Sequence, residues 1–182
     1  LYKVKRGKSE RYLKDDSELN AYLLEAALDG AALSGAPGQA AITGNALGQL
    51  CQDNLAVENT IRRLARRYDT RLLKNLVHLP TLGADTLKDA KQLEGFVREL
   101  QQQLAGHANG ARYDVTLGTS AISGASEILV TRAEHGAITI SRIDAEFVSS
   151  GEYRGMRSLG GKLHGLIREG ATVQRGDKSQ AV

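Results

Sequence analysis

The sequence predicts an α+β fold in which helical and β-rich segments follow one another along the chain. Three patterns indicate this class: a basic alternating stretch at the start, apolar residues at helical spacing in the middle, and β-branched alternating runs after Gly106. The chain has 182 residues, 41% of them hydrophobic, and one cysteine, so we expect a core that needs neither disulfides nor a structural metal. The predicted order is a basic β-hairpin and short helix, a helical subdomain of about three helices, an antiparallel β-meander, and a C-terminal helix and strand.

The start of the chain predicts the hairpin and the short helix. Residues 1–5 alternate between apolar and polar side chains, residues 6–8 (Arg-Gly-Lys) supply a turn, and residues 9–14 continue as a second strand. The run Asp-Asp-Ser at 15–17 offers N-caps, and apolar residues at helical spacing extend this helix to about Leu28. Because Leu1 already lies in a strand pattern and is not an initiator Met, we expect a segment of a longer protein.

A glycine- and alanine-rich stretch, residues 30–44, predicts a loop with one short strand at 31–33. The strongest helical periodicity then covers residues 45–68, where a mostly apolar stripe includes Leu50, Asn54, Val57, Ile61 and Leu64. We expect one long helix there.

Two further helices complete the predicted helical subdomain. Asp69-Thr70 is expected to cap a helix that ends at Pro80, and Asp85-Thr86 to cap another that runs to about Gln103. Short joints between successive helices are typical of a small helical bundle.

The remaining elements are predicted from a change of period. Residues 112–118, 126–133 and 137–143 are β-branched and alternating, which favours an antiparallel meander. Helical spacing returns from 149–150 onward, and 171–175 forms a last strand. Gly161 and Gly165 lie four residues apart in this last helix, and we expect them to permit close backbone packing.

The formal net charge of +3 conceals two basic segments. Residues 1–14 contain six cations and one acid: Lys3, Lys5, Arg6, Lys8, Arg11 and Lys14, against Glu10. Residues 62–74 contain six cations and one acid: Arg62, Arg63, Arg66, Arg67, Arg71 and Lys74, against Asp69. Each segment therefore carries +5, and the rest of the chain carries −7. Charge gathered in this way can act on a polyanion.

Each basic segment has a functional and a purely structural interpretation. In the hairpin, six cations within 14 residues are hard to neutralise locally, which favours a polyanion partner. In the second segment, a helix would place four arginines within an arc of about 140°, roughly opposite the apolar stripe: Arg62, Arg63, Arg66 and Arg67. Guanidinium forks suit phosphate oxygens. The alternative is a solvated face paired with acids such as Glu58, Asp69 or the carboxylates of a neighbouring helix.

Other kinds of site have weaker support. The four histidines, His78, His107, His135 and His164, lack clustered ligands, so we expect no metal site. Asp15 and Asp16 fit a helix cap better than a metal pair. No phosphate-binding glycine loop and no nucleophile with its base is present, and no apolar run approaches the ~20 residues that span a bilayer. Cys51 alone fits a reducing cytoplasm, where we expect the protein to reside.

Several motifs resemble the B subunit of bacterial DNA gyrase. They are L-Y-K-V-K-R-G-K at 1–8, Y-L-K-D-D at 12–16, A-L-D-G-A at 27–31, I-R-R-L at 61–64, R-R-Y at 66–68, P-T-L at 80–82, E-F at 146–147 and G-E-Y-R at 151–154. The first three resemble the segment that follows the metal-binding TOPRIM region, and the others resemble the long insertion of many Gram-negative gyrase B subunits.

The resemblance implies a domain organisation. Residues 1–20 would be the trailing hairpin of the TOPRIM region and 21–182 the insertion domain, with a helical part at about 44–105 and a β-rich part at about 111–175. The parent enzyme would use ATP and Mg²⁺ to pass one DNA duplex through another and introduce negative supercoils, as an A2B2 heterotetramer with the gyrase A subunit. That partner carries the strand-breaking tyrosine, and the nucleotide-binding and metal-binding motifs of the family are absent from this chain.

We therefore expect a non-catalytic insertion module with no cofactor of its own. It would contact duplex DNA, the A subunit or both, and couple DNA binding to ATP turnover. The twelve cations of the two basic segments are the candidate contact residues. The alternative is a structural spacer or protein-interaction module with no direct DNA contact.

Overall fold

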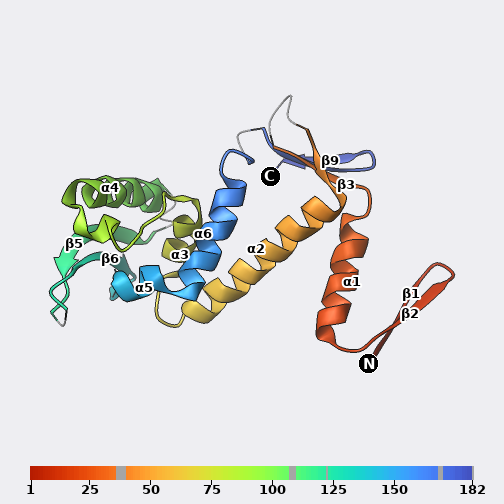
Figure 1. Ribbon diagram of the computed structural model, residues 1–182, viewed down its shortest axis with the longest axis horizontal. Coiled ribbons are helices and arrows are strands. Elements are labelled where there is room, and N and C mark those ends of the chain that lie inside the picture. The colour runs from red at the N-terminus through yellow and green to blue at the C-terminus, as the bar shows by residue number, and fades with distance from the viewer. Residues whose placement is uncertain (36–39, 107–109, 122, 168–169, 182) are drawn as a thin grey trace. The chain divides into compact units, whose positions relative to one another are not determined.

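The computed structural model describes residues 1–35, 40–106, 110–121, 123–167 and 170–181. Helices and antiparallel sheets make up the described chain, which confirms the α+β class. The chain divides into two compact units: residues 1–52 with 165–182 form the first, and residues 53–164 form the second (Figure 1).

The first unit begins with the predicted hairpin. Strands β1 (Tyr2–Arg6) and β2 (Ser9–Leu13) pair antiparallel, and Gly7 takes the left-handed conformation (φ 61°) that their turn requires. Helix α1 (Asp16–Leu28) follows, and Asp15 caps it by accepting a hydrogen bond from the Glu18 N–H. The hairpin and the short helix are thus confirmed.

A four-stranded antiparallel sheet completes this unit, in the order β4 (Ile42–Thr43), β3 (Ala31–Ser34), β8 (Thr172–Arg175), β9 (Lys178–Ala181). The sequence predicts β3 and β8, but not β4, β9 or the pairing of β3 with β8 across about 140 residues. Its small core contains Ala31, Leu33 and Leu47, and Leu47 comes from the first turns of helix α2 (Gly44–Leu64).

Helix α2 is shorter than predicted and ends at Leu64 rather than Tyr68. The amides of Arg67 and Tyr68 both donate to the Leu64 carbonyl, and Asp69 adopts an extended conformation because it caps the next helix. Arg66 and Arg67 therefore lie in the turn after the helix. The expectation that four arginines share one helical face is wrong for these two.

The helical part of the second unit continues with α3 (Thr70–His78) and α4 (Ala90–Gly106). Asp69 caps α3 as predicted, through the Leu72 N–H. The predicted start of the third helix is wrong, because residues 86–88 form only a 3₁₀ turn and Asp89 caps α4 through the amides of Lys91 and Gln92.

The sheet of the second unit is the predicted meander, β5 (Arg112–Thr119), β6 (Ser126–Glu134) and β7 (Ala137–Ile143). Helix α4 runs beside it (Figure 1), and the Gln101 side-chain amide bonds the backbone of Tyr113 and Val115 on β5. The two C-terminal helices of the unit are α5 (Ala145–Ser149) and α6 (Gly151–Leu163).

Close packing between α3 and α6 depends on Gly160 and not on the predicted glycines. A Cβ at Gly160 would lie 1.9 Å from the Val77 carbonyl oxygen, whereas a Cβ at Gly161 meets nothing within 4 Å. Gly165 lies beyond the end of α6, with φ 72°. The small residue that matters is therefore Gly160.

Candidate nucleic-acid interface

The hairpin carries six candidate cations, and three of them pair with acids. Lys3 and Lys5 both approach Glu10, at 2.8 and 4.0 Å, because the three side chains share one face of the two strands. Arg6 pairs with Asp29 at 2.8 Å, and this hydrogen bond raises the pKa of the Arg6 guanidinium. Because only two carboxylates take part in these contacts, they offset two of the six positive charges, and exposed pairs of this kind contribute little to stability.

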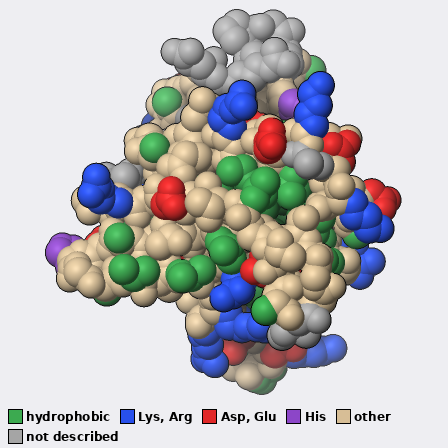
Figure 2. All heavy atoms as spheres, turned by 90° about the vertical axis from the view of Figure 1, so that its left-hand side faces the viewer, with side chains coloured by type: hydrophobic (Ala, Val, Ile, Leu, Met, Phe, Trp, Pro, Cys, Tyr) green, Lys and Arg blue, Asp and Glu red, His purple; other side chains and the backbone are tan. Residues whose placement is uncertain are grey.

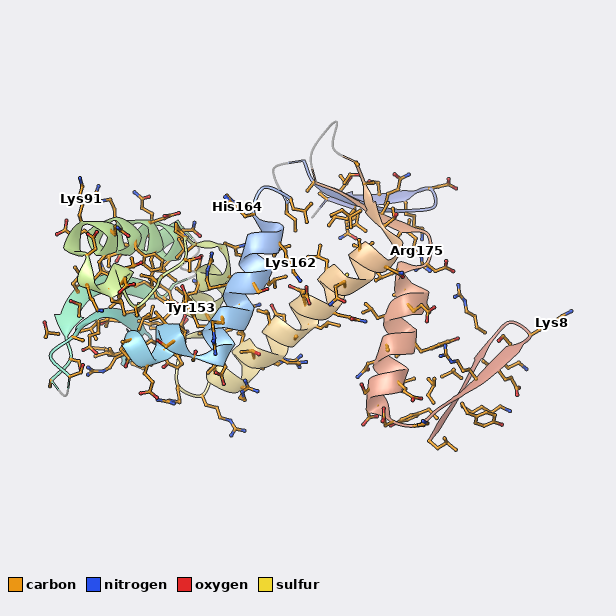
Figure 3. All side chains as sticks on the ribbon, in the orientation of Figure 1. Lys8, Lys91, Tyr153, Lys162, His164 and Arg175 are labelled. Atoms are coloured by element: carbon orange, nitrogen blue, oxygen red, sulfur yellow. The ribbon has the colours of Figure 1, made fainter. Side chains whose placement is uncertain are left out.

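The other three hairpin cations are Lys8, Arg11 and Lys14. None of them forms an ion pair with an acid in the part of the chain that the structure describes. Lys8 lies at the hairpin tip and its side chain points away from the strands (Figure 3). Arg6 and Arg11 also line an open cavity of about 720 Å³ that includes residues of α1, β3 and the start of α2. The hairpin thus retains three solvated cations.

The second set of candidates lies where α2 ends and α3 begins, and we call it the arginine corner: Arg62, Arg63, Arg66, Arg67, Arg71 and Lys74. Arg63 pairs with Glu152 of α6 at 3.2 Å, and Lys74 pairs with Glu58 at 3.6 Å. Among the described residues, the only side-chain partner of Arg62 is the neutral Asn59. Arg62 and Arg63 occupy the last turn of α2, where cations also stabilise the helix through its dipole.

Two arginines of the corner lie over tyrosine rings. The Arg67 guanidinium is 5.9 Å from the Tyr68 ring centroid, and that of Arg71 is 5.7 Å from the Tyr113 ring centroid. Neither is paired with a described acid, and Arg71 Nη1 is buried without a hydrogen-bond partner among the described residues. Arg66 is exposed and likewise has no acid partner in the described chain.

The acid nearest to these arginines in sequence, Asp69, is already occupied. Its side chain accepts hydrogen bonds from the Leu72 N–H at 2.9 Å and the Tyr113 hydroxyl at 3.2 Å, and it approaches Arg132 Nε at 3.6 Å. Burial, followed by the nearby Asp69 charge, raises the pKa of Tyr113. Asp69 therefore does not neutralise the corner, because its partners are a helix N-terminus, a tyrosine and an arginine of β6. The other acids of the sequence alternative do pair with the corner: Glu58 with Lys74, and Glu152 of the neighbouring helix α6 with Arg63.

The tyrosines beneath the arginines are anchored in the core. The Tyr68 ring packs on Phe147 with centroids 4.9 Å apart, and Phe147 packs on Tyr153 at 5.4 Å. Tyr153 is buried, and its hydroxyl accepts a hydrogen bond from the Leu82 N–H at 3.0 Å. Burial raises the pKa of Tyr68 and of Tyr153. A series of tilted ring contacts thus leads from the core to the Arg67 guanidinium.

The structure separates the twelve sequence-predicted cations into two groups. Five are paired with acids: Lys3, Lys5, Arg6, Arg63 and Lys74. Seven have no ion pair with any described acid: Lys8, Arg11, Lys14, Arg62, Arg66, Arg67 and Arg71. Tyr68 and Tyr113 were not among the contact residues predicted from the sequence. Tyr68 could have been found from its place beside Arg67, whereas Tyr113 is distant in sequence and gives no such signal.

The face drawn in Figure 2 is mixed in charge. Lysines, arginines and acids are scattered over it, and exposed hydrophobic side chains form several groups. No three His, Cys, Asp or Glu side chains of the described residues gather as metal ligands would. His78, His135 and His164 are exposed, and His107 lies outside the described residues. No described helix is long and apolar enough to cross a bilayer.

Two family models match the chain, and both belong to the B subunit of DNA gyrase. The model of the DNA gyrase B subunit insert domain matches residues 31–182, and the model described as GyrB, hook matches residues 1–28. The chain belongs to the gyrase B insert-domain family, which confirms the resemblance seen in the sequence. The hook match includes the whole of the hairpin and α1.

Individual relatives agree with the family. The chain is 40% identical over 83 residues to the DNA gyrase B subunit of Caulobacter vibrioides, and 35% identical over 86 residues to that of Myxococcus xanthus. These regions cover 46% and 47% of this chain and 10% of each relative. The type 2 topoisomerase B subunit of Aquifex aeolicus is 27% identical over 154 residues, 85% of this chain and 18% of the relative. The chain thus spans a small part of these relatives.

Proposed function

We propose that this chain is a non-catalytic module of a DNA gyrase B subunit that contacts duplex DNA and couples DNA binding to ATP turnover. The observation that carries the proposal is the group of seven cations without acid partners in the described chain. The relatives of this chain are named as B subunits of DNA gyrase. Unpaired guanidinium and ammonium groups attract the DNA backbone without reading its sequence.

The parent enzyme provides the setting for this role. ATP and Mg²⁺ would be bound by parts of the enzyme outside this chain, next to a TOPRIM region that precedes it. The full assembly would be a cytoplasmic A2B2 heterotetramer with the gyrase A subunit, which introduces negative supercoils. Within it, the hairpin and the arginine corner would contribute sequence-independent affinity for DNA.

The test uses the full B subunit assembled with the A subunit. Glutamine replaces the unpaired cations in two sets, one in the hairpin (Lys8, Arg11, Lys14) and one in the corner (Arg62, Arg66, Arg67, Arg71). DNA affinity is measured across a salt titration, together with DNA-stimulated ATP hydrolysis. For each phosphate interaction that a substitution removes, the slope of log affinity against log salt should become shallower by about 0.9.

The competing function is that of a spacer or protein-interaction module. If both sets of substitutions leave DNA affinity, its salt slope and DNA-stimulated ATP hydrolysis unchanged, the module has no direct DNA contact. Association with the A subunit in the absence of DNA is measured in parallel. A decrease confined to that measurement would assign the basic surfaces to the A subunit instead.

A further inference from the structure

We propose that Arg67 and Arg71 are the phosphate-binding residues of the arginine corner, and that Tyr68 and Tyr113 are the positioning residues that hold them ready. This inference rests on the proposed function, because it takes the ligand to be the backbone phosphate of duplex DNA. It divides the seven unpaired cations into two that are fixed in place and five that are solvated.

Each of the two guanidinium groups lies over a tyrosine ring. At 5.9 Å and 5.7 Å from the Tyr68 and Tyr113 centroids, both groups lie within the range of cation–π attraction. A guanidinium held over a ring can keep N–H donors available for phosphate oxygens. In Arg71 these donors are Nε and Nη2, because Nη1 is buried. The ring contact therefore orients each group without consuming all of its hydrogen-bonding capacity.

Both tyrosines, Tyr68 and Tyr113, are held in place by further contacts. Tyr68 is held by Phe147, which packs on the buried Tyr153, and Tyr113 lies in β5 with its hydroxyl bonded to Asp69. Ordering a free arginine or lysine side chain on binding costs conformational entropy. An arginine already fixed on a ring loses less entropy, so its contact with phosphate contributes more to affinity.

The acids near Arg67 and Arg71 are engaged with other groups. Asp69 lies between the two arginines in sequence, but it is engaged with the α3 N-terminus, Tyr113 and Arg132. The acids that do reach the corner, Glu152 and Glu58, pair with Arg63 and Lys74. The charges of Arg67 and Arg71 are thus left for a partner from outside the described chain.

We take the ligand of Arg67 and Arg71 to be DNA phosphate and not an acidic protein segment, because the chain belongs to a gyrase B family. Both arginines would act through backbone phosphates, so the affinity should not depend on DNA sequence. The test therefore compares duplexes of unrelated sequence, and an effect limited to association with the A subunit would overturn the assignment to DNA.

The experiment uses the full B subunit assembled with the A subunit, together with a linear duplex. Arg67→Gln and Arg71→Gln should each lower DNA affinity about five- to tenfold and make the log–log salt slope shallower by about 0.9. Arg63→Gln and Lys74→Gln are matched controls from the same corner, and because acids pair with these two cations, each should change affinity less than twofold.

A second set of variants tests the positioning role. Tyr68→Leu removes the ring and should weaken DNA binding about two- to fivefold with the salt slope unchanged, while Tyr68→Phe keeps the ring and should bind as the wild type does. Arg67→Lys keeps the charge but loses the planar stack, so it should also keep the slope and lose affinity. Thermal unfolding of each variant separates this effect from a loss of folding.

Two results would overturn the inference. If Arg67→Gln and Arg71→Gln bind DNA like the wild type while Arg62→Gln and Arg66→Gln do not, the solvated arginines are the contacts, and the proposed function survives. If Tyr68→Leu binds as well as Tyr68→Phe, the ring does not position Arg67. Only unchanged DNA binding by every cation variant, including those of the hairpin, would remove the proposed function as well.

Discussion

Gly160 and Val77 approach so closely that a side chain at Gly160 has no room. A Cβ there would lie 1.9 Å from the Val77 carbonyl oxygen, and backbone cannot give way as a flexible side chain can. This contact joins α6 to the C-terminal end of α3, and α3 begins at the arginine corner. The orientation of the corner therefore depends in part on a glycine in another helix.

Gly160→Ala should strongly destabilise the second unit. The added methyl group must separate α6 from α3, and overpacking of this kind costs about 1–3 kcal/mol or more. Gly161→Ala is the matched control, because its Cβ meets nothing within 4 Å and alanine favours a helix by up to about 1 kcal/mol. Urea denaturation of the two variants should shift the midpoint in opposite directions; a neutral Gly160→Ala would mean that the helices are not in this contact.

Arg157→Ala should also destabilise the same helix pair. The Arg157 guanidinium donates to the carbonyl oxygens of Val77 and Leu79 at the end of α3, and to the Thr81 hydroxyl at 3.0 Å. Without it these carbonyls lose a charged donor, and we expect a decrease in unfolding free energy of about 1.5–3 kcal/mol. Arg154→Ala is the control, since Arg154 is exposed on the same helix, and it should change the unfolding free energy by less than about 0.5 kcal/mol.

Tyr153→Phe should change how stability depends on alkaline pH. Burial raises the pKa of Tyr153 above 10.0, so above about pH 10 the unfolded chain loses this proton while the folded chain keeps it. Stability is then present below pH 10 and falls as pH rises through the folded pKa, by at most about 1.4 kcal/mol per pH unit.

The variant removes this group and also the acceptor of the Leu82 N–H. It should therefore be about 1–2 kcal/mol less stable than the wild type at pH 7, with a difference that narrows above pH 10. Urea titrations at pH 7 and at several pH values above 10 measure this difference. A constant difference across that range would show that Tyr153 ionises equally in both states.

Asp89→Ala tests where helix α4 begins. Asp89 accepts from the amides of Lys91 and Gln92, whereas the Asp85 side chain makes no capping bond. Removal of the Asp89 cap should cost about 1 kcal/mol, measured by chemical denaturation. Asp85→Ala should be nearly neutral, because its pair with Lys88 is solvated. The reverse ranking would restore the helix start that the sequence predicts.

Local elements could be predicted from the sequence because their signals span only a few residues. The alternation in β5, β6 and β7 and the caps at Asp15 and Asp69 depend on neighbours along the chain, and the structure confirms them. The family could also be recognised from short motifs. The end of α2 was missed because apolar spacing continues past Leu64, whereas the packing of Tyr68 on Phe147 does not show in that spacing.

For the candidate site, too, the sequence predicts one part and tertiary packing decides the other. The clustering of the cations in two segments can be read from the residues alone, since charge density is a property of composition. Which of these cations are neutralised, and which are held on rings, depends on tertiary packing. Arg63 meets Glu152 across 89 residues, and Arg71 meets Tyr113 across 42. Such pairs exist only once distant segments have packed, because no local propensity links residues so far apart in the chain.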